Sequence, residues 1–340
     1  MSTYPYAELH CHTNFSFLDG AAHPEELALR AAELGYTALG ITDHDGFRGV
    51  VKVHRAAQQV GLPVVYGTEV GMNRNASSPG EEPPDEPVQE LVAAEAVSEA
   101  RKRGRIRRMH GSKPMLLPAK DHLVLLAPDP AGYAAISRFV TRGQFHGRKD
   151  APEYRYEELA EAARDGDLVA LTGCHQGAVP RAAAAGDLQG ALDAASRLRE
   201  LFPGRLFVEL WHHGMPEDDA RNDMVAHVAE RLRLPTVATN NVHYTHRSDA
   251  YLSEVLAAIG GRRNLDKADG FRPATDERHL KSGEEMTRRF SRYRGAVARA
   301  AELGRSLAFD LDLLTPRLPD FPMPGGFISE DDYLGHIVTE

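Results

Sequence analysis

The sequence predicts a closed or nearly closed parallel α/β barrel. Along the 340 residues, about seven strand-like runs alternate with amphipathic helices, a pattern typical of a parallel sheet with helices on its outside. Histidine, cysteine and acidic residues follow several of these runs directly. In barrel enzymes the active site forms at the carboxyl ends of the strands. We therefore expect these side chains to meet at one end of the barrel.

The first strand-like run, residues 7–9, leads directly into His10, Cys11 and His12. In an extended chain, side chains at positions i and i+2 point to the same face, so the two imidazoles form a chelating pair. A single His-x-His pair is more often an ordinary surface feature. The metal interpretation gains weight because further ligand-type residues recur at the edges of later strand-like runs: Asp43, His44, Asp45, Glu69, Asp121, His122, Cys174, His175, Asn240, Asn241 and His243.

The next two helix and strand pairs have clear boundary signals. The first helix has a proline and acidic residues in its first turn and a glycine just past its end, and the second also stops at a glycine; these residues favour helix starts and stops. Each strand then ends just before a candidate ligand. The expected elements are helix 24–34, strand 36–42, helix 50–60 and strand 62–67.

The alternation resumes after residue 120, where His122 poses a problem. It stands at the start of a strand, which is the wrong end for a simple parallel barrel. We expect that the third strand overshoots the barrel and that the returning segment brings His122 back beside Glu69. The later expected strands are 122–127, 167–172, 205–210 and 235–239, and the helices are 131–145, 156–164, 187–202 and 217–232.

Residues 73–120 interrupt this rhythm with an acidic, proline-rich half and a basic half. We expect an inserted, largely disordered loop. The basic run Arg101–Arg108 is interpreted as a solvated charged segment that folds back on the acidic half. Contact with a phosphate backbone is the alternative for this run.

The character of the sequence changes again after residue 270. We expect connecting helices over 271–315, with a helical pair at 281–309, and a proline-rich linker over 316–340 that leads into a short helix with a capping box at Ser329. Asp310 and Asp312 are interpreted as part of a solvated turn, not as a catalytic pair. The chain stops within this pattern, as a piece of a longer protein would.

Composition limits the classes of function. The formal net charge of -9 argues against a broad DNA-coating surface. Both cysteines, Cys11 and Cys174, stand inside candidate metal motifs, so a disulfide framework is not expected. No charged leader precedes an apolar core, and no apolar run approaches the roughly 18 residues of a membrane span. We expect a cytoplasmic protein without a membrane partner.

Three segments carry a resemblance to a known family. Residues 10–20 (HCHTNFSFLDG), 40–46 (GITDHDG) and 238–244 (ATNNVHY) resemble motifs of the polymerase-and-histidinol-phosphatase (PHP) domain at the amino terminus of bacterial C-family DNA polymerases. With 263–265 and 271–273, they most resemble the error-prone, damage-inducible branch. The resemblance implies a distorted seven-stranded (β/α) barrel over residues 1–270 with a C-terminal helical extension.

The resemblance also implies up to three divalent metals in a cleft, with Zn²⁺ or Mn²⁺ favoured and Mg²⁺ as an alternative. Catalytic roles would fall to His12, Asp19, His44 and His243. Asn241 stands where metal-complete members carry Asp, and a neutral amide binds a cation more weakly than a carboxylate does, so one metal should be weakened or lost. The implied metal ligands are His10, His12, Asp19, His44, Glu69, His122, Cys174, Asn241 and His243.

Metal-assisted phosphoester hydrolysis is the chemistry that such a cleft supports, and intact family members act as 3′–5′ exonucleases. DNA would be the partner through a longer parent polymerase in DNA repair and translesion synthesis, with other mutagenesis or repair proteins as further partners; polymerase activity would belong to that parent. Two alternatives stay open: a free-standing phosphatase for a small phosphomonoester such as histidinol phosphate, and a non-catalytic, metal-stabilised scaffold. The roles of Asp43 and Asp45, as orienting or helix-capping groups, and of His175, His212 and His213, as phosphate contacts or backbone-satisfied side chains, also stay open.

Overall fold

The computed structural model describes residues 4–73, 120–148, 151–268, 270–311 and 321–339. Residues 74–119 of the inserted segment, which include the basic run Arg101–Arg108, and Asp312 lie outside the described residues. The chain forms two compact units, Met1–Phe309 and Asp310–Glu340. The second unit contains helix α12 (Glu330–Thr339), at whose start the Ser329 hydroxyl accepts the Asp332 N–H at 3.1 Å.

A single seven-stranded sheet forms the centre of the first unit, with its strands in sequence order. The pairs β1–β2, β2–β3, β5–β6 and β6–β7 are parallel, whereas β4 runs antiparallel to both β3 and β5. The α/β class is therefore confirmed, but an all-parallel order is wrong at β4. The strands are β1 (Ala7–Glu8), β2 (Ala38–Ile41), β3 (Val64–Asn73), β4 (Lys120–Leu126), β5 (Val169–Leu171), β6 (Leu206–Leu210) and β7 (Thr236–Ala238).

The sheet curls round, so that the segments that follow its first and last strands meet. Just beyond β1 and β7, Cys11 and Val242 form a parallel bridge. The Val242 N–H donates to the His10 carbonyl at 2.9 Å, and the His12 N–H donates to the Val242 carbonyl at 2.8 Å. This contact between the segments after β1 and β7 brings the start of the chain beside residues more than two hundred positions later.

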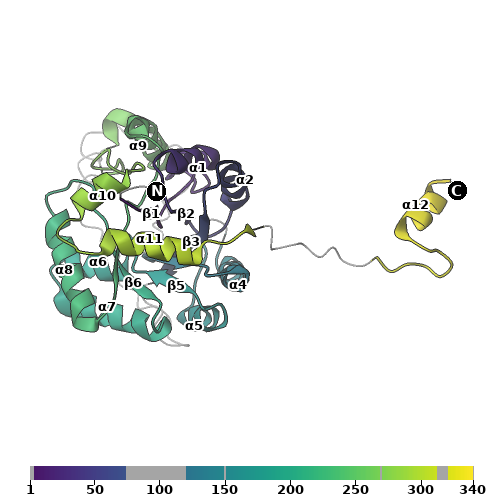
Figure 1. Cartoon of the computed structure of the whole chain (residues 1–340), viewed down its shortest axis with the longest axis horizontal. Helices are drawn as coiled ribbons and strands as arrows, with labels where there is room; N and C mark the ends of the chain where they lie inside the picture. Colours follow the sequence, from purple (N-terminus) through teal and green to yellow (C-terminus); the bar gives the residue numbers. More distant parts are fainter. Residues whose placement is uncertain (1–3, 74–119, 149–150, 269, 312–320, 340) are drawn as a thin grey trace, which may run out of the picture. The chain divides into compact units, whose positions relative to one another are not determined.

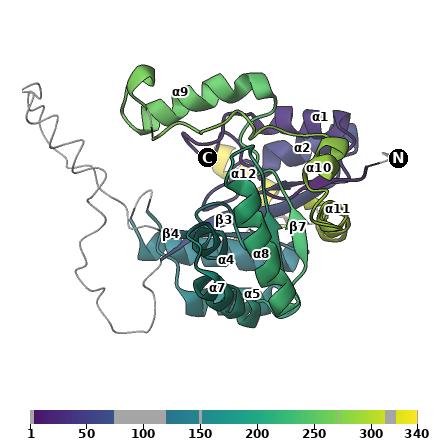
Figure 2. The ribbon, with the colours of Figure 1, turned by 90° about the vertical axis from the view of Figure 1, so that its left-hand side faces the viewer.

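Helices surround the curled sheet, as Figures 1 and 2 show. Most of the predicted helices are present, whereas α6, α9 and the two short 3₁₀ helices were not predicted. The helices are α1 (Pro24–Glu33), α2 (Val50–Val60), α4 (Pro130–His146), α5 (Tyr156–Asp165), α6 (Ala178–Ala184), α7 (Leu188–Leu201), α8 (Asp218–Leu232), η1 (Arg247–Asp249), α9 (Ala250–Gly260), η2 (Leu265–Lys267), α10 (Gly283–Arg289) and α11 (Ala296–Leu307).

Helix α11, in the C-terminal extension, packs across the amino-terminal ends of the strands. A Cβ added at Gly304 would lie 2.6 Å from the Cβ of Ala7 and 3.1 Å from the Cβ of Ala38, the first residues of β1 and β2. Arg299 donates to the Thr236 hydroxyl at the start of β7 at 3.2 Å. The extension therefore closes the end of the barrel opposite the candidate ligands.

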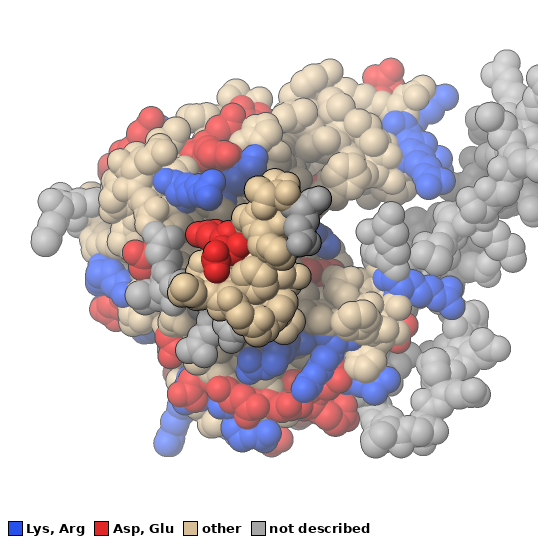
Figure 3. Space-filling model, turned by 90° about the vertical axis from the view of Figure 1, so that its right-hand side faces the viewer, with Lys and Arg blue, Asp and Glu red and all other residues tan. Residues whose placement is uncertain are grey.

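The described residues form no continuous basic face on the side viewed in Figure 3. Basic and acidic side chains lie close together there and do not separate by sign. No helix in the described part of the chain is long and apolar enough to cross a membrane.

Candidate metal centre

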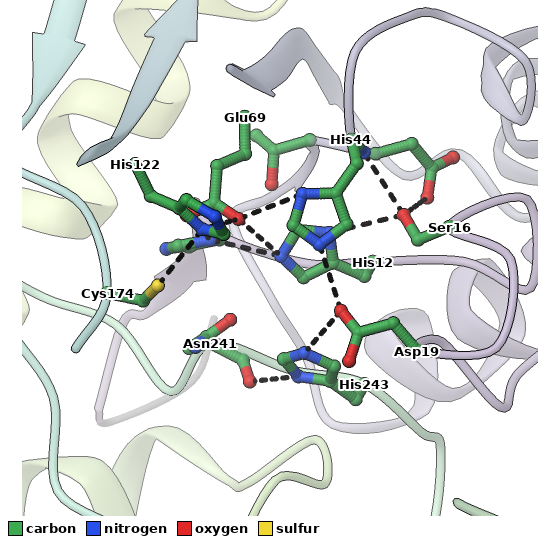
Figure 4. Close-up of polar contacts among 12 residues, drawn as sticks. His12, Ser16, Asp19, His44, Glu69, His122, Cys174, Asn241 and His243 are labelled. Atoms are coloured by element: carbon green, nitrogen blue, oxygen red, sulfur yellow. Dashed lines mark hydrogen bonds and ion pairs between the residues drawn. The ribbon is translucent and has the colours of Figure 1, made fainter. Parts of the chain in front are cut away.

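His10 and His12 leave β1 on the same face, as their spacing predicts. Their Nε2 atoms lie 3.1 Å apart, and both side chains are buried. Two imidazole nitrogens this close in the barrel interior face a common centre. Figure 4 shows His12 in the middle of a group of polar side chains that come from several strands.

Glu69 is the hub of this group. Its carboxylate is 1% exposed and is surrounded by four imidazoles. Oε1 lies 3.4 Å from His10 Nε2. Oε2 lies 3.6 Å from His12 Nε2 and 3.2 Å from His44 Nδ1. His44 reaches this position because it forms a parallel bridge with Glu69 at the exit of β2.

His122 is the fourth imidazole, and the antiparallel strand β4 brings it there. Strand β3 extends to Asn73, and the register of the β3–β4 pair sets Gly71 opposite His122. His122 Nδ1 lies 3.1 Å from Glu69 Oε2 and 3.5 Å from the Cys174 sulfur. The structure thus shows the expected overshoot and return of the chain, with His122 beside Glu69.

Asp19 and His243 form the more open side of the cluster. Asp19 Oδ2 lies 2.9 Å from His44 Nε2 and 3.2 Å from His243 Nε2, and the Asp19 side chain is 39% exposed. Leu18 adopts a left-handed conformation (φ 64°) in the preceding turn. His243 is fixed from its other side because Nδ1 lies 2.8 Å from the Asn241 carbonyl. Asp19 therefore joins two imidazoles at the solvent-facing edge.

Asn241 adopts a left-handed conformation (φ 45°) and is buried. Its side-chain oxygen Oδ1 has no hydrogen-bond partner among the described residues. An unsatisfied buried oxygen costs roughly 1–3 kcal/mol. A cation is one partner that would satisfy this oxygen.

Two groups of ligand atoms lie close enough to hold a metal ion each. One comprises His10, His12 and Glu69, and the other comprises His44, Glu69 and His122; within each group the atoms are within 4.8 Å of one another. Glu69 belongs to both groups. A carboxylate with two oxygens can bridge two ions, so the geometry suits a multinuclear site of imidazole and carboxylate ligands.

The charges within the cluster depend strongly on one another. Burial opposes protonation of His44, but Asp19 and Glu69 outweigh it and raise the pKa of His44 to about 9. Burial, together with the imidazoles of His44 and His243, lowers the pKa of His12 well below its ordinary value. Burial raises the pKa of the Cys174 thiol. A bound cation would displace the His44 proton and stabilise the Cys174 thiolate.

Glu209 supports the cluster from behind and was not among the predicted residues. Its Oε1 lies 2.7 Å from His10 Nδ1 and accepts the Thr239 hydroxyl at 2.5 Å. A carboxylate on Nδ1 orients the ring so that Nε2 faces a metal, and it increases the basicity of the ligand. Glu209 lies inside β6, and its only signal in the sequence is a charged residue within an otherwise apolar run.

Asp43 holds the loop that carries the first histidines. It accepts the Thr13 N–H at 2.7 Å and the Ser16 hydroxyl at 2.7 Å. The Ser16 oxygen in turn accepts the His44 N–H at 3.1 Å. The capping alternative for Asp43 and Asp45 is wrong, because helix α2 begins after Gly49 without a side-chain cap.

The other three candidate histidines, His175, His212 and His213, lie outside the cluster. His213 Nε2 lies 2.7 Å from the Asn240 carbonyl, so the backbone satisfies this buried ring. His212 lies 3.5 Å from Asp218 and 3.6 Å from Asp219. The His175 ring lies against Trp211, with ring centroids 6.3 Å apart. Of the three, only His175 stays next to the cluster, since it follows Cys174.

Residues 8–213 match the family described as the PHP domain. The match begins in β1 and runs past β6, so it includes all the histidines around Glu69. The match stops before His243, which the curled sheet brings back to the cluster. The family match and the geometry of the site therefore concern the same part of the barrel.

The chain is also similar to larger proteins. It is 38% identical over 339 residues to an error-prone DNA polymerase of Mycobacterium bovis, covering 99% of this chain and 28% of that protein. It is 27% identical to a DNA polymerase III subunit alpha of Treponema pallidum, over 99% and 26% of the two chains. The structure of an amidohydrolase from Chromobacterium violaceum aligns with a TM-score of 0.40 and 16% identity, over 70% and 88%. The chain thus spans little more than a quarter of the curated relatives it matches.

Proposed function

Because the chain belongs to the PHP domain family, we propose that the cluster around Glu69 binds divalent metal ions and hydrolyses phosphoesters. One ion would be held by His10, His12 and Glu69, and a second by Glu69, His44 and His122, with Cys174 as a further ligand. Asp19, His243 and the weaker donor Asn241 would complete a third position. Zn²⁺ and Mn²⁺ suit this mixture of imidazole, carboxylate and thiolate donors best.

The observation that carries this proposal is the environment of Glu69. The carboxylate is almost completely buried, and the ion-pair partners described for it are all imidazoles, none a lysine or arginine. Burying a charge is costly unless it is paired or coordinates a metal. Four imidazoles around one carboxylate are suitable metal ligands, whereas the same polar groups would be unfavourable in an apolar core.

The residues of the cluster have different roles, which depend on where each lies. When bound, divalent ions lower the pKa of a coordinated water and stabilise charge on the phosphoryl oxygens. Asp19, His44 and His243 lie on the exposed side of the cluster, where a substrate enters. Burial opposes ionisation of Asp19, but the imidazoles of His243 and His44 outweigh it and hold its pKa well below the ordinary value, so this carboxylate stays charged and can bind a cation. Glu209 keeps the His10 ring oriented throughout.

We propose that the substrate is the 3′ end of single-stranded DNA and that the activity is a 3′–5′ exonuclease. Similarity to error-prone DNA polymerases supports this substrate. In a longer parent protein, the cleft would act in DNA repair and translesion synthesis in the cytoplasm, where DNA and other repair proteins are its partners. Templated polymerisation would reside in other parts of that parent.

Asn241 supports a second candidate, a metal-stabilised scaffold without turnover. Its neutral amide stands among the ligands where a carboxylate would bind a cation more strongly. A scaffold would lose thermal stability on chelation yet never hydrolyse DNA. Restoring the carboxylate with Asn241→Asp would then create activity that the unmodified chain lacks.

The test is hydrolysis of 3′-labelled single-stranded DNA by the 340-residue chain in Mn²⁺ and in Zn²⁺. We expect release of labelled mononucleotide, loss of release in the presence of chelator, and loss in His12→Ala. Arg288→Ala, an exposed change on α10, serves as the matched control for purification and contaminating nucleases. Equal release from His12→Ala and from the control would contradict the assignment. Faster hydrolysis of a small phosphomonoester than of DNA would favour the phosphatase alternative.

A further inference from the structure

A pocket of about 290 Å³ lies between α6, α8 and the segment 270–280. His175, which follows the candidate ligand Cys174 in the chain, forms part of its wall. Ligand pockets have volumes of roughly 300–1,000 Å³ and are mostly apolar with a few polar groups. At about 290 Å³ the pocket lies at the lower limit of this range, so it suits a single base and no larger group, and through His175 it adjoins the metal cluster.

Two rings form a corner of this pocket. Trp211 and His175 meet at an interplanar angle of 76°, with their centroids 6.3 Å apart. Trp211 is held firmly, because the Arg221 guanidinium lies 3.3 Å from its ring centroid and pairs with Asp218 at 2.6 Å. Proteins that bind single strands use aromatic rings as surfaces for bases. Trp211 is 7% exposed and Arg221 covers one of its faces, so the exposed His175 ring is the surface on which a flat base could stack, with Trp211 behind it.

Arg278 supplies a positive charge between this pocket and the metal cluster. It lines the pocket, and its carbonyl accepts the N–H of His243 at 2.8 Å. Within the residues described, no carboxylate lies at ion-pair distance from its guanidinium. Neighbouring arginines differ, since Arg289 pairs with Glu277 at 2.8 Å and Arg247 pairs with Asp276 at 2.7 Å.

An arginine held beside a reaction cleft without a carboxylate partner matches a phosphate in geometry and charge. We propose that Arg278 and the Trp211–His175 corner form a nucleotide subsite, in which Arg278 binds the phosphodiester next to the scissile phosphate and the corner holds the flanking base. This inference rests on the proposed function only for the identity of the reacting phosphate. It makes an oligonucleotide the preferred ligand, because a small phosphomonoester would leave the pocket unused.

Trp211 is the single tryptophan of the chain, so its fluorescence reports on this pocket alone. The experiment titrates the 340-residue chain with tetrathymidylate in the presence of chelator, so that no hydrolysis intervenes. We expect a saturable change in emission. Loss of a charge-assisted phosphate contact in Arg278→Ala should raise the Kd by about tenfold. Arg288→Ala, whose side chain is exposed and carries the same charge, should leave the Kd unchanged.

A second variant fills the pocket without touching any metal ligand. Ala274 lines the pocket and is exposed, so Ala274→Phe should abolish the emission change and keep the metal content. An emission that does not change, a Kd that neither variant alters, or an equal response to inorganic phosphate alone would overturn the subsite. If metal binding fails but the saturable response persists, the proposed hydrolysis is wrong and the subsite stands.

Discussion

Replacing Glu209 by Gln tests how the cluster is supported, because it removes one charge and almost no volume. Oε1 of Glu209 has two close partners, His10 Nδ1 at 2.7 Å and the Thr239 hydroxyl at 2.5 Å. Oε2 has no hydrogen-bond partner among the described residues. A glutamine can keep its oxygen toward both partners and place its NH₂ group in the position of Oε2. The change therefore isolates the charge behind His10.

The expected size of the effect follows from the role of that charge. Carboxylates behind metal-bound histidines are worth about 10- to 100-fold in metal affinity, which corresponds to about 1.4–2.7 kcal/mol. We expect Glu209→Gln to weaken Zn²⁺ binding at the His10 site by this factor, measured by competition with a chromogenic chelator. Binding at the second ligand group, which lacks His10, should change less.

Glu200→Gln provides the matched control, since it makes the same chemical change on the exposed surface of α7. Thermal melting of both variants shows whether the fold is kept. Zn²⁺ affinity in Glu209→Gln within about twofold of the control would refute the reasoning, because the His10 ring would then need no charge behind it.

Four further predictions concern the cluster and the barrel. Asn241→Asp adds a carboxylate to the ligands and should tighten the weakest metal position by about tenfold, as read from elemental analysis after dialysis; unchanged content would contradict the role of Asn241. The pKa of His44 is raised to about 9, so protons compete with metal below that value, and apparent metal affinity should rise about tenfold per pH unit from roughly pH 6.5 to 9. In the metal-free chain the same raised pKa stabilises the fold fully below about pH 6.5, and that contribution is lost as the pH rises through about 9; melting curves that lack this trend in the presence of chelator would count against it. In Gly304→Val, the new Cβ would lie 2.6 Å from that of Ala7. This overpacking should lower the free energy of unfolding by about 1–3 kcal/mol, measured by urea titration, with Gly335→Val on α12 as the control.

Much of the barrel could be predicted from the sequence, because strand ends and helix boundaries leave local signals. The spacing of His10 and His12 predicts a shared face, and the two Nε2 atoms lie 3.1 Å apart. The position of His122 at the start of a strand predicts a reversal of the chain, which the antiparallel β3–β4 pair shows. In both cases the arrangement depends on local geometry.

Glu209 could not be predicted in the same way. Its role depends on β6 lying near β1 across the curled sheet, and 199 residues separate Glu209 from His10. No local pattern distinguishes a buried glutamate that orients a histidine from one at an exposed strand position. Arg278 could not be predicted either, because its proposed role depends on the tertiary fold. The fold places its carbonyl beside the His243 N–H and leaves its guanidinium without a carboxylate partner in the described part of the chain.

The most direct test of the account is the metal content of the chain, measured by elemental analysis with Glu69→Gln alongside. Glu69 belongs to both groups of ligand atoms, so we predict about two ions per unmodified chain, one for each group. Glu69→Gln should lose most of both, while Glu200→Gln retains them. A metal-free unmodified chain, or a Glu69→Gln variant that keeps its full metal content, would contradict the central claim that this carboxylate organises the site.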